Sequence, residues 1–244
     1  MDEGLRAGLF LSGLRRIGKT TFLTNDLIPA LEEAGALVIY VDLWSNTQAS
    51  PASQVLAAVK KTLTELTTTG SNILTGLKRN TGADIGIAGF KFGFKLDTLG
   101  QEGGPSLAQA LMEVVDQAKT NVALIVDAVQ LAITSEASKK MLLALKTARD
   151  AINSRPHTPG RFIFVGTGSH YAMVTEIAAR KNPAFVGATS ISYPVLGRDY
   201  VVHLLNRLAQ EGAMAQPSID VAERAFATRG SRPEELQRAL RLLN

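Results

Sequence analysis

The residues with the clearest chemistry form a loop near the start of the chain, Gly13-Leu14-Arg15-Arg16-Ile17-Gly18-Lys19-Thr20. This run matches the phosphate-binding pattern G-x-x-x-x-G-K-[ST], in which two glycines let the backbone turn so that successive N–H groups face one anion. The lysine can bridge the β- and γ-phosphates of a nucleotide, and the threonine hydroxyl can bind Mg²⁺. We therefore predict a nucleotide site formed by Gly13, Arg15, Arg16, Ile17, Gly18, Lys19, Thr20 and Thr21.

The elements around this loop favour the same interpretation. Residues 8–12 form a short apolar run that ends at the loop, and residues 19–34 carry apolar side chains at helical spacing. This strand, loop and helix order separates a phosphate-binding loop from a chance match, and the helix N-terminus adds partial positive charge. The alternative is a glycine-rich turn that only joins strand to helix. Cradling phosphates does not require Arg15 or Arg16, and we expect them to face solvent, with a neighbouring subunit as the alternative.

A second candidate site lies at the end of the apolar run 121–127. Asp127 fits a carboxylate that contacts Mg²⁺ through water, because ligands of parallel sheets gather at the carboxyl ends of strands. Hydrolysis also requires a group within hydrogen-bond reach of the attacking water, and Ala128 offers none. Gln130 would lie on the other side of a continuing strand and could at most polarise a water. Asp42 ends the neighbouring apolar run and is a weaker candidate for the metal or the water than for a turn.

Strands and helices are expected to alternate through most of the chain, which is typical of an α/β protein with a parallel sheet. Beyond the runs above, we predict strands at 36–44, 161–167 and 190–196, and helices at 52–68, 106–119, 136–153, 198–211, 218–228 and 233–243. Only helices are expected after about residue 196. We therefore expect an α/β nucleotide-binding core over residues 1–196, with a parallel five-stranded sheet flanked by helices, and a helical lid over residues 197–244.

A hairpin-like insertion is expected at about residues 85–98. Three phenylalanines, Phe90, Phe92 and Phe94, alternate there with lysines and glycine, and strict alternation is typical of a half-buried strand. Packing of these rings against the core is the interpretation that we favour. Because Lys91 and Lys95 share a face, a projection that contacts DNA or a protein partner is the alternative.

The composition is that of an ordinary globular protein, with 244 residues, 45% hydrophobic and 20% charged. There is no cysteine, and His157, His170 and His203 are too far apart to suggest a zinc site. No window approaches the roughly 18 apolar residues of a membrane span, and the first residues lack a signal-peptide layout, so we expect a cytoplasmic protein without a membrane partner. The net charge of +4, with its excess after residue 155, is only a weak indication of nucleic-acid binding.

Three runs in this order, GLRRIGKTTFL, LIVDAVQ and FIFVGTGS, resemble motifs of the AAA+ ATPases, most of all the archaeal-type and origin-recognition-related branch. The resemblance covers residues 8 to about 240; its first two motifs are common to P-loop NTPases, and the third indicates the branch. It implies an ATPase that uses ATP and Mg²⁺, forms a ring or helical homo-oligomer, and acts on a macromolecule, with DNA or another protein as candidates. The alternatives are an ATP-binding signalling or scaffold switch and, less favoured, a small-molecule kinase.

The resemblance also implies roles for single residues. Ser169, and after it Thr167, stands at the sensor-1 position that contacts the γ-phosphate. Arg232 is the better match for the lid arginine of sensor 2. Arg180 and Arg198 are candidates for the arginine finger that completes the site of a neighbouring subunit. Each has a plainer alternative. The sensor-1 residues could belong to a turn after a strand, the lid arginine to a helix start, and the two finger candidates could be solvated surface arginines.

The catalytic glutamate of the family would fall on Ala128. Since the loop, the lysine and the metal ligands remain, the resemblance implies a protein that binds ATP and hardly hydrolyses it. An engineered alanine is the interpretation that we favour, and a naturally inactive nucleotide switch is the alternative.

Overall fold

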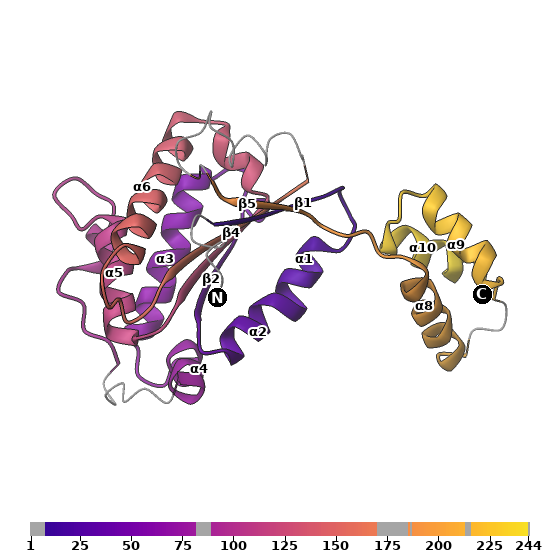
Figure 1. Cartoon of the computed structure of the whole chain (residues 1–244), viewed down its shortest axis with the longest axis horizontal. Coiled ribbons are helices and arrows are strands. Elements are labelled where there is room, and N and C mark those ends of the chain that lie inside the picture. Colours follow the sequence, from indigo (N-terminus) through magenta and orange to yellow (C-terminus); the bar gives the residue numbers. More distant parts are fainter. Residues whose placement is uncertain (1–7, 82–88, 170–184, 186, 213–215, 244) are drawn as a thin grey trace.

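The computed structural model describes residues 8–81, 89–169, 185, 187–212 and 216–243. It contains a sheet of five parallel strands in the order β2-β3-β4-β1-β5, flanked by helices (Figure 1), so the predicted fold class is confirmed. The strands are β1 (Leu9–Ser12), β2 (Leu37–Asp42), β3 (Val122–Asp127), β4 (Phe162–Gly168) and β5 (Thr189–Ser192). The longer helices are α3 (Pro51–Thr67), α4 (Asn72–Thr81), α5 (Leu107–Ala118), α6 (Glu136–Asn153), α8 (Arg198–Gln210), α9 (Ile219–Thr228) and α10 (Pro233–Arg241). No helix in the described ranges is long and apolar enough to cross a membrane.

The inner strands β3 and β4 are buried on both faces of the sheet, which explains why they are almost continuously apolar, whereas the edge strand β5 is largely exposed. Every residue of β3 is buried, and β3 pairs with β2 on one side and β4 on the other. Ile125 and Val165 pack on one face with Leu23 of the helix that follows the loop. Leu124 and Phe164 belong to the larger core on the other face, which α3, α5 and α6 cover. The carboxyl ends of these strands are thereby fixed beside the phosphate-binding loop.

The helix that begins at the phosphate-binding loop runs as predicted but contains a wider turn. It consists of α1 (Lys19–Phe22), a π-helical turn η2 (Leu23–Leu27) and α2 (Ile28–Glu33) without a break. Pro29 lies in the first turn of α2 and cannot donate a backbone hydrogen bond, which is a physical reason for the irregular turn before it. The first turn of this helix, which would face a phosphate, remains regular.

The predicted strand in the phenylalanine-rich segment is wrong for residues 89–95, which are not in a strand; residues 85–88 lie outside the described ranges. A short 3₁₀ turn η3 (Leu96–Thr98) follows. Phe90 is buried, and the rings of Phe92 and Phe94 stack with centroids 5.5 Å apart beside the main core. The amides of residues 91 and 93 donate to side chains of α5. Those side-chain acceptors replace the partner strand that alternation alone suggested.

The helices α8, α9 and α10 form a small three-helix unit to one side of the sheet (Figure 1). Their apolar side chains make a cluster of their own, separate from the clusters of the sheet. Val201, Leu204, Phe226 and Leu236 form its centre, each at most 2% exposed. The helices themselves match the prediction, and the boundary between residues 196 and 197 stays a prediction.

Candidate nucleotide-binding site

A cleft of about 840 Å³ lies where the phosphate-binding loop, the ends of the inner strands and the lid helices meet. This volume is within the range of about 300–1,000 Å³ that is typical of ligand pockets. Lys19 and Thr20 line it from the loop, Asp127 from the end of β3, and Glu234 and Gln237 from α10. The cleft therefore combines both sequence motifs with the predicted lid.

The backbone of the loop explains its two glycines. Gly18 has φ of 98°, in the left-handed region where an L side chain is strained. At Gly13, an added Cβ would approach the Ile17 side chain to 2.8 Å and Tyr193 Cβ to 3.2 Å. Ile17 is 1% exposed and so anchors the middle of the loop in the interior. The loop is thus a tight turn whose middle is anchored by the buried Ile17 side chain, and Arg15, Arg16, Gly18, Lys19 and Thr20 of the loop line the cleft.

Lys19 is mostly buried at the start of α1. Its Nζ donates to the carbonyl oxygens of Gly13, at 2.8 Å, and Leu14, which belong to the same loop. Burial lowers the pKa of Lys19, the Asp127 carboxylate opposes that change, and the nearby Arg15 guanidinium lowers the pKa further. A partly desolvated ammonium of this kind is suited to a strongly charged acceptor such as phosphate.

Asp127 is held by donors from several elements. Its Oδ2 accepts a hydrogen bond from the hydroxyl of Thr20 at 2.6 Å, and its Oδ1 accepts from the Thr167 hydroxyl and from the Ala128 amide, the latter at 2.8 Å. Tyr40 on β2 lies near this carboxylate; burial, followed by the charge of Asp127, raises the pKa of its phenol. The carboxylate is 7% exposed, so its position is fixed by protein contacts.

The pair formed by Thr20 and Asp127 fits a Mg²⁺ site. Both residues offer hard oxygen donors, and Mg²⁺ is usually held by one or two such groups together with water and nucleotide phosphates. Within the described ranges, no group of three or more His, Cys, Asp or Glu side chains could hold a metal ion by itself. The chemistry of the donors therefore suits a cation that arrives with a phosphate ligand.

Ala128 changes the direction of the chain directly after β3. Its φ of 60° and ψ of 38° are left-handed, and a 3₁₀ turn η4 (Val129–Ile133) begins after it. Because the strand ends here, the expectation that Gln130 lies on its far side is wrong, and Gln130 lines the cleft. The Gln130 Nε2 lies 3.5 Å from Ser169 Oγ, while its buried Oε1 has no hydrogen-bond partner among the described residues.

The two sensor-1 candidates occupy different positions. Ser169, just beyond the end of β4, lines the cleft and faces the Arg15 and Gln130 side chains. Thr167 is fully buried, and its hydroxyl donates to Asp127. This placement is compatible with the preference for Ser169 as the residue nearer to a nucleotide, and it gives Thr167 the task of orienting the carboxylate.

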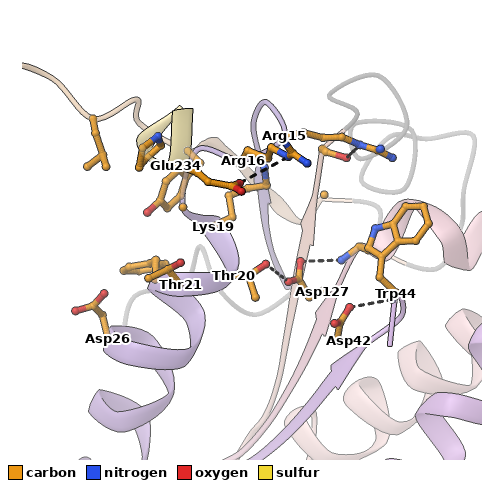
Figure 2. A pocket seen from close by; sticks show the side chains of 18 of the residues that line it. Arg15, Arg16, Lys19, Thr20, Thr21, Asp26, Asp42, Trp44, Asp127 and Glu234 are labelled. Atoms are coloured by element: carbon orange, nitrogen blue, oxygen red, sulfur yellow. Dashed lines mark hydrogen bonds and ion pairs between the residues drawn. The ribbon is translucent and has the colours of Figure 1, made fainter. Parts of the chain in front are cut away.

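The two arginines of the loop point in different directions (Figure 2). Arg15 lies over the ring of Trp44, with its guanidinium carbon 5.3 Å from the ring centroid. Arg16 forms ion pairs with Glu234 at 3.9 Å and Glu235 at 3.4 Å, both at the start of α10. Arg16 has φ of 65°, an uncommon conformation for a residue with a side chain. The loop is therefore connected to the strand ends through one arginine and to the lid through the other.

The predicted arginines Arg198 and Arg232 do not line the cleft. Arg232 precedes the first turn of α10, and its neighbours on that helix line the cleft instead. Arg198 forms ion pairs within the lid, with Asp220 at 2.8 Å and with Glu223. Arg180 lies outside the described residues. Their roles as lid sensor or arginine finger stay predictions.

Several aromatic residues that line the cleft were not identified from the sequence. Tyr193 lies beyond the end of β5, with its ring 5.7 Å from that of Phe22 on α1, and Tyr200 reaches the cleft from α8. Trp44 lies two residues after the end of β2. For Trp44, the sequence did offer a signal, because the single tryptophan of the chain stands at the end of an apolar run, where residues at the carboxyl end of a strand can face a ligand. Asp42, which the sequence left open, lines the cleft and also accepts the Trp44 amide at 2.8 Å.

Comparison with known proteins places the fold. No protein-family model matches this chain, and no curated protein matches it. The Orc1 protein of Aeropyrum pernix, solved in complex with DNA, matches with a TM-score of 0.56 and 13% identity over 94% of this chain and 51% of that one. The Orc2 protein of the same organism, solved as ADPNP-ADP complexes, matches with a TM-score of 0.54 and 15% identity, over 94% of this chain and 54% of that one. Cdc6p of Pyrobaculum aerophilum matches with a TM-score of 0.54 and 15% identity, over 88% of this chain and 47% of that one.

These similarities define the class of fold. The α/β sheet with its flanking helices has the fold of these Orc1, Orc2 and Cdc6p structures. The chain spans about half the length of the solved proteins that it matches. At 13% to 15% identity the likeness establishes the fold alone.

Proposed function

We propose that this protein is an AAA+-type ATP-binding protein that holds Mg·ATP in the cleft between the loop, the strand ends and the lid. The observation that carries the proposal is the 2.6 Å hydrogen bond from Thr20 to Asp127. It joins Thr20, the last residue of the loop, to the carboxylate at the end of β3, so two motifs distant in sequence meet where both would hold a Mg²⁺ ion. The similarity to Orc2 solved with ADPNP and ADP supports the choice of nucleotide.

The residues of the loop would act mainly through charge. Backbone N–H groups of the loop and the first turn of α1 bind phosphate oxygens, and Lys19 adds a full positive charge. Mg²⁺, when bound, neutralises phosphate charge and fixes the phosphate geometry. Asp127 holds its position through Thr167 and the Ala128 amide, so it does not need to rearrange when a cation binds next to Thr20.

We further propose that this chain keeps its ATP rather than hydrolysing it quickly. A methyl group at position 128 cannot accept a proton from an attacking water, and general-base assistance is worth about 10²–10⁴-fold in rate. Ala128 is 3% exposed and its amide N–H already donates to Asp127, so this N–H is not free to orient the attacking water. A glutamate at this position would make the chain an ATPase.

Nucleotide binding is expected to act on assembly and on a macromolecular partner. In our leading hypothesis the protein forms a ring or helical homo-oligomer with ATP and acts on that partner, with DNA as the first candidate because the similar Orc1 protein was solved in complex with DNA. The second hypothesis is a signalling or scaffold switch, in which ATP binding alone sets the assembly state and hydrolysis is not needed.

The test compares the parent chain with Ala128→Glu and with Ala128→Gln as a control of similar size that lacks a base. For each form, one measures Mg·ATP affinity by calorimetry, phosphate release, and particle mass with and without ATP and double-stranded DNA. We expect similar ATP affinity in all three, an increase in phosphate release of at least about 100-fold only for Ala128→Glu, and larger particles with ATP.

The outcomes separate the hypotheses. If none of the forms binds ATP, the proposed function is wrong. If all bind ATP and the particles grow, but Ala128→Glu releases no more phosphate than Ala128→Gln, the switch hypothesis replaces the ATPase. Larger particles that form only when DNA is added would identify DNA as the partner.

A further inference from the structure

Arg15 lines the cleft, and the phosphate-binding motif does not explain its charge. Its side chain leaves the loop toward the strand ends, where its Nε lies 3.4 Å from Ser169 Oγ and its guanidinium carbon 5.3 Å from the Trp44 ring centroid. Arg15, Trp44 and Ser169 all line the cleft together with Lys19 and Asp127. A permanently charged guanidinium therefore lies on the Asp127 side of the site, where the terminal phosphate is expected.

The contacts of Arg15 leave its charge uncompensated. Whereas Arg16 in the same loop pairs with two glutamates of α10, Arg15 forms no ion pair with any carboxylate in the described part of the chain. A hydroxyl and an aromatic face hold it instead, and both are neutral partners that a phosphate would outcompete. Arg15 and Lys19 line the same cleft, so the two cations face the same region.

Trp44 is held in place at the cleft rather than in the core. Trp44, the only tryptophan of the chain, is 48% exposed, although a large aromatic side chain is usually buried. A turn at the end of β2 fixes it, because the Asp42 carboxylate accepts the Trp44 amide at 2.8 Å and the Asp42 carbonyl accepts the Ser45 hydroxyl at 2.6 Å. An exposed indole positioned in this way provides a platform for a guanidinium.

We propose that Arg15 distinguishes a nucleoside triphosphate from a diphosphate: its guanidinium moves from Trp44 and Ser169 to bind the terminal phosphate of the nucleotide held by its own chain. The inference rests on the proposed nucleotide-binding function and makes it more specific. It places in the loop itself a positive charge that an arginine of a neighbouring subunit would otherwise supply. ATP and ADP then leave Arg15, and with it the surroundings of Trp44, in different positions.

The single tryptophan makes this inference directly measurable. Mg·ATP and Mg·ADP are titrated into the full chain, with affinities from calorimetry and emission from Trp44 in parallel. In the parent, we expect the two nucleotides to give different Trp44 emission. In Arg15→Gln, ATP affinity should fall about tenfold, the size expected for loss of a charge-assisted hydrogen bond, while ADP affinity changes less than about twofold.

Arg16→Gln is the matched control, because it removes the same charge from the adjacent residue, which faces the lid. It should shift the affinities for ATP and ADP by the same factor and keep the difference in Trp44 emission between them. Trp44→Phe should keep the preference for ATP, since a platform remains, and should abolish the emission signal.

Two results would overturn the inference while leaving the proposed function intact. The first is an Arg15→Gln variant that weakens ATP and ADP equally or weakens neither. The second is a parent that binds both nucleotides and gives the same Trp44 emission with each. If the parent binds neither nucleotide by calorimetry, the proposed function fails first, and the inference fails with it.

Discussion

The strand side of the cleft and its lid side are held by contacts of different kinds. On the strand side, Asp127 is 7% exposed and accepts hydrogen bonds from the side chains of α1 and β4, and Lys19 is similarly buried. On the lid side, Arg16 meets Glu234 and Glu235 through ion pairs whose side chains are 61%, 72% and 25% exposed. Buried hydrogen bonds to charged groups are costly to break, whereas exposed ion pairs contribute little.

This difference suggests a division of tasks within one site. The strand side has a fixed geometry that a metal ion and phosphates can use without rearrangement, which is what precise positioning requires. The lid side can change its contacts at small cost, as an element that responds to bound nucleotide must. Substitutions on the strand side should therefore have large effects that do not depend on salt, and substitutions on the lid side small ones that do.

The largest effect is expected for Lys19→Ala. Removing the ammonium from its buried position should weaken Mg·ATP binding by about 100-fold, or roughly 3 kcal/mol. Because burial lowers the pKa of Lys19 below 10.5, parent affinity should also fall as pH rises through that lowered pKa, since the charge is then lost. Calorimetric titrations across alkaline pH measure both effects. Lys146→Ala, which removes a partly exposed lysine paired with Asp150 on α6, is the control and should bind ATP like the parent.

Thr167→Val tests the buried hydrogen bond that the Thr167 hydroxyl donates to Asp127. The variant keeps the shape of the side chain but leaves a buried carboxylate without one donor, so the free energy of unfolding should fall by about 1–3 kcal/mol. Urea denaturation followed by circular dichroism measures it. Thr167→Ser restores the hydroxyl and should recover most of the loss; a serine variant as unstable as the valine variant would contradict the assigned hydrogen bond.

A smaller effect is expected for Ala128→Gly, which concerns the turn after β3. The left-handed backbone at φ 60° is strained for alanine and not for glycine, so the free energy of unfolding should rise by about 0.5–1 kcal/mol despite the added flexibility of the unfolded chain. Ala132→Gly, at a buried alanine of η4 with ordinary φ, should destabilise the protein instead. The two variants should therefore shift the thermal midpoint in opposite directions.

The smallest effect is expected on the lid side. Replacing Glu234 and Glu235 together by glutamine frees Arg16 and removes two negative charges from the cleft region. Affinity for Mg·ATP should rise about twofold, or less than about 0.5 kcal/mol, because the pairs are exposed. The gain should disappear at about 1 M salt, where charges are screened within about 3 Å. Glu211→Gln removes a lid charge that pairs with Arg207 and should change the affinity little; a tenfold loss in the double variant would contradict the contrast between the two sides.

Much of the strand side could be predicted because it depends on local patterns. The apolar runs, the helical spacing after residue 19 and the loop motif each reflect burial or backbone geometry over a few residues, and the strands and helices match them. The strand predicted in the phenylalanine-rich segment is wrong because that prediction also used only a local pattern. Alternation correctly indicated that one side of the segment packs on the core, with Phe90 buried and Phe92 and Phe94 partly buried. Hydrogen bonds to side chains of α5, distant in sequence, take the place of a partner strand.

The lid and the turn at Ala128 could not be predicted in this way. The left-handed conformation of Ala128 ends the strand and brings Gln130 into the cleft, and no local periodicity encodes such a turn at a residue other than glycine. In the lid, helix-start residues were recognised, but which face of α10 meets the loop depends on how three helices pack. Glutamates rather than Arg232 therefore contact the loop.

The sequence by itself determined the alternation of strands and helices along most of the chain, the loop motif at residues 13–20, the carboxylate at the end of β3 and the alanine after it. Those features follow from residue type and short-range spacing. Only the tertiary structure decided that Thr20, Asp127 and Thr167 form one hydrogen-bonded unit and that Arg15 lies against Trp44 while Arg16 turns to the lid. These contacts join residues from different strands and helices, so they depend on the register of the sheet and the packing of the lid, which no single stretch of sequence specifies.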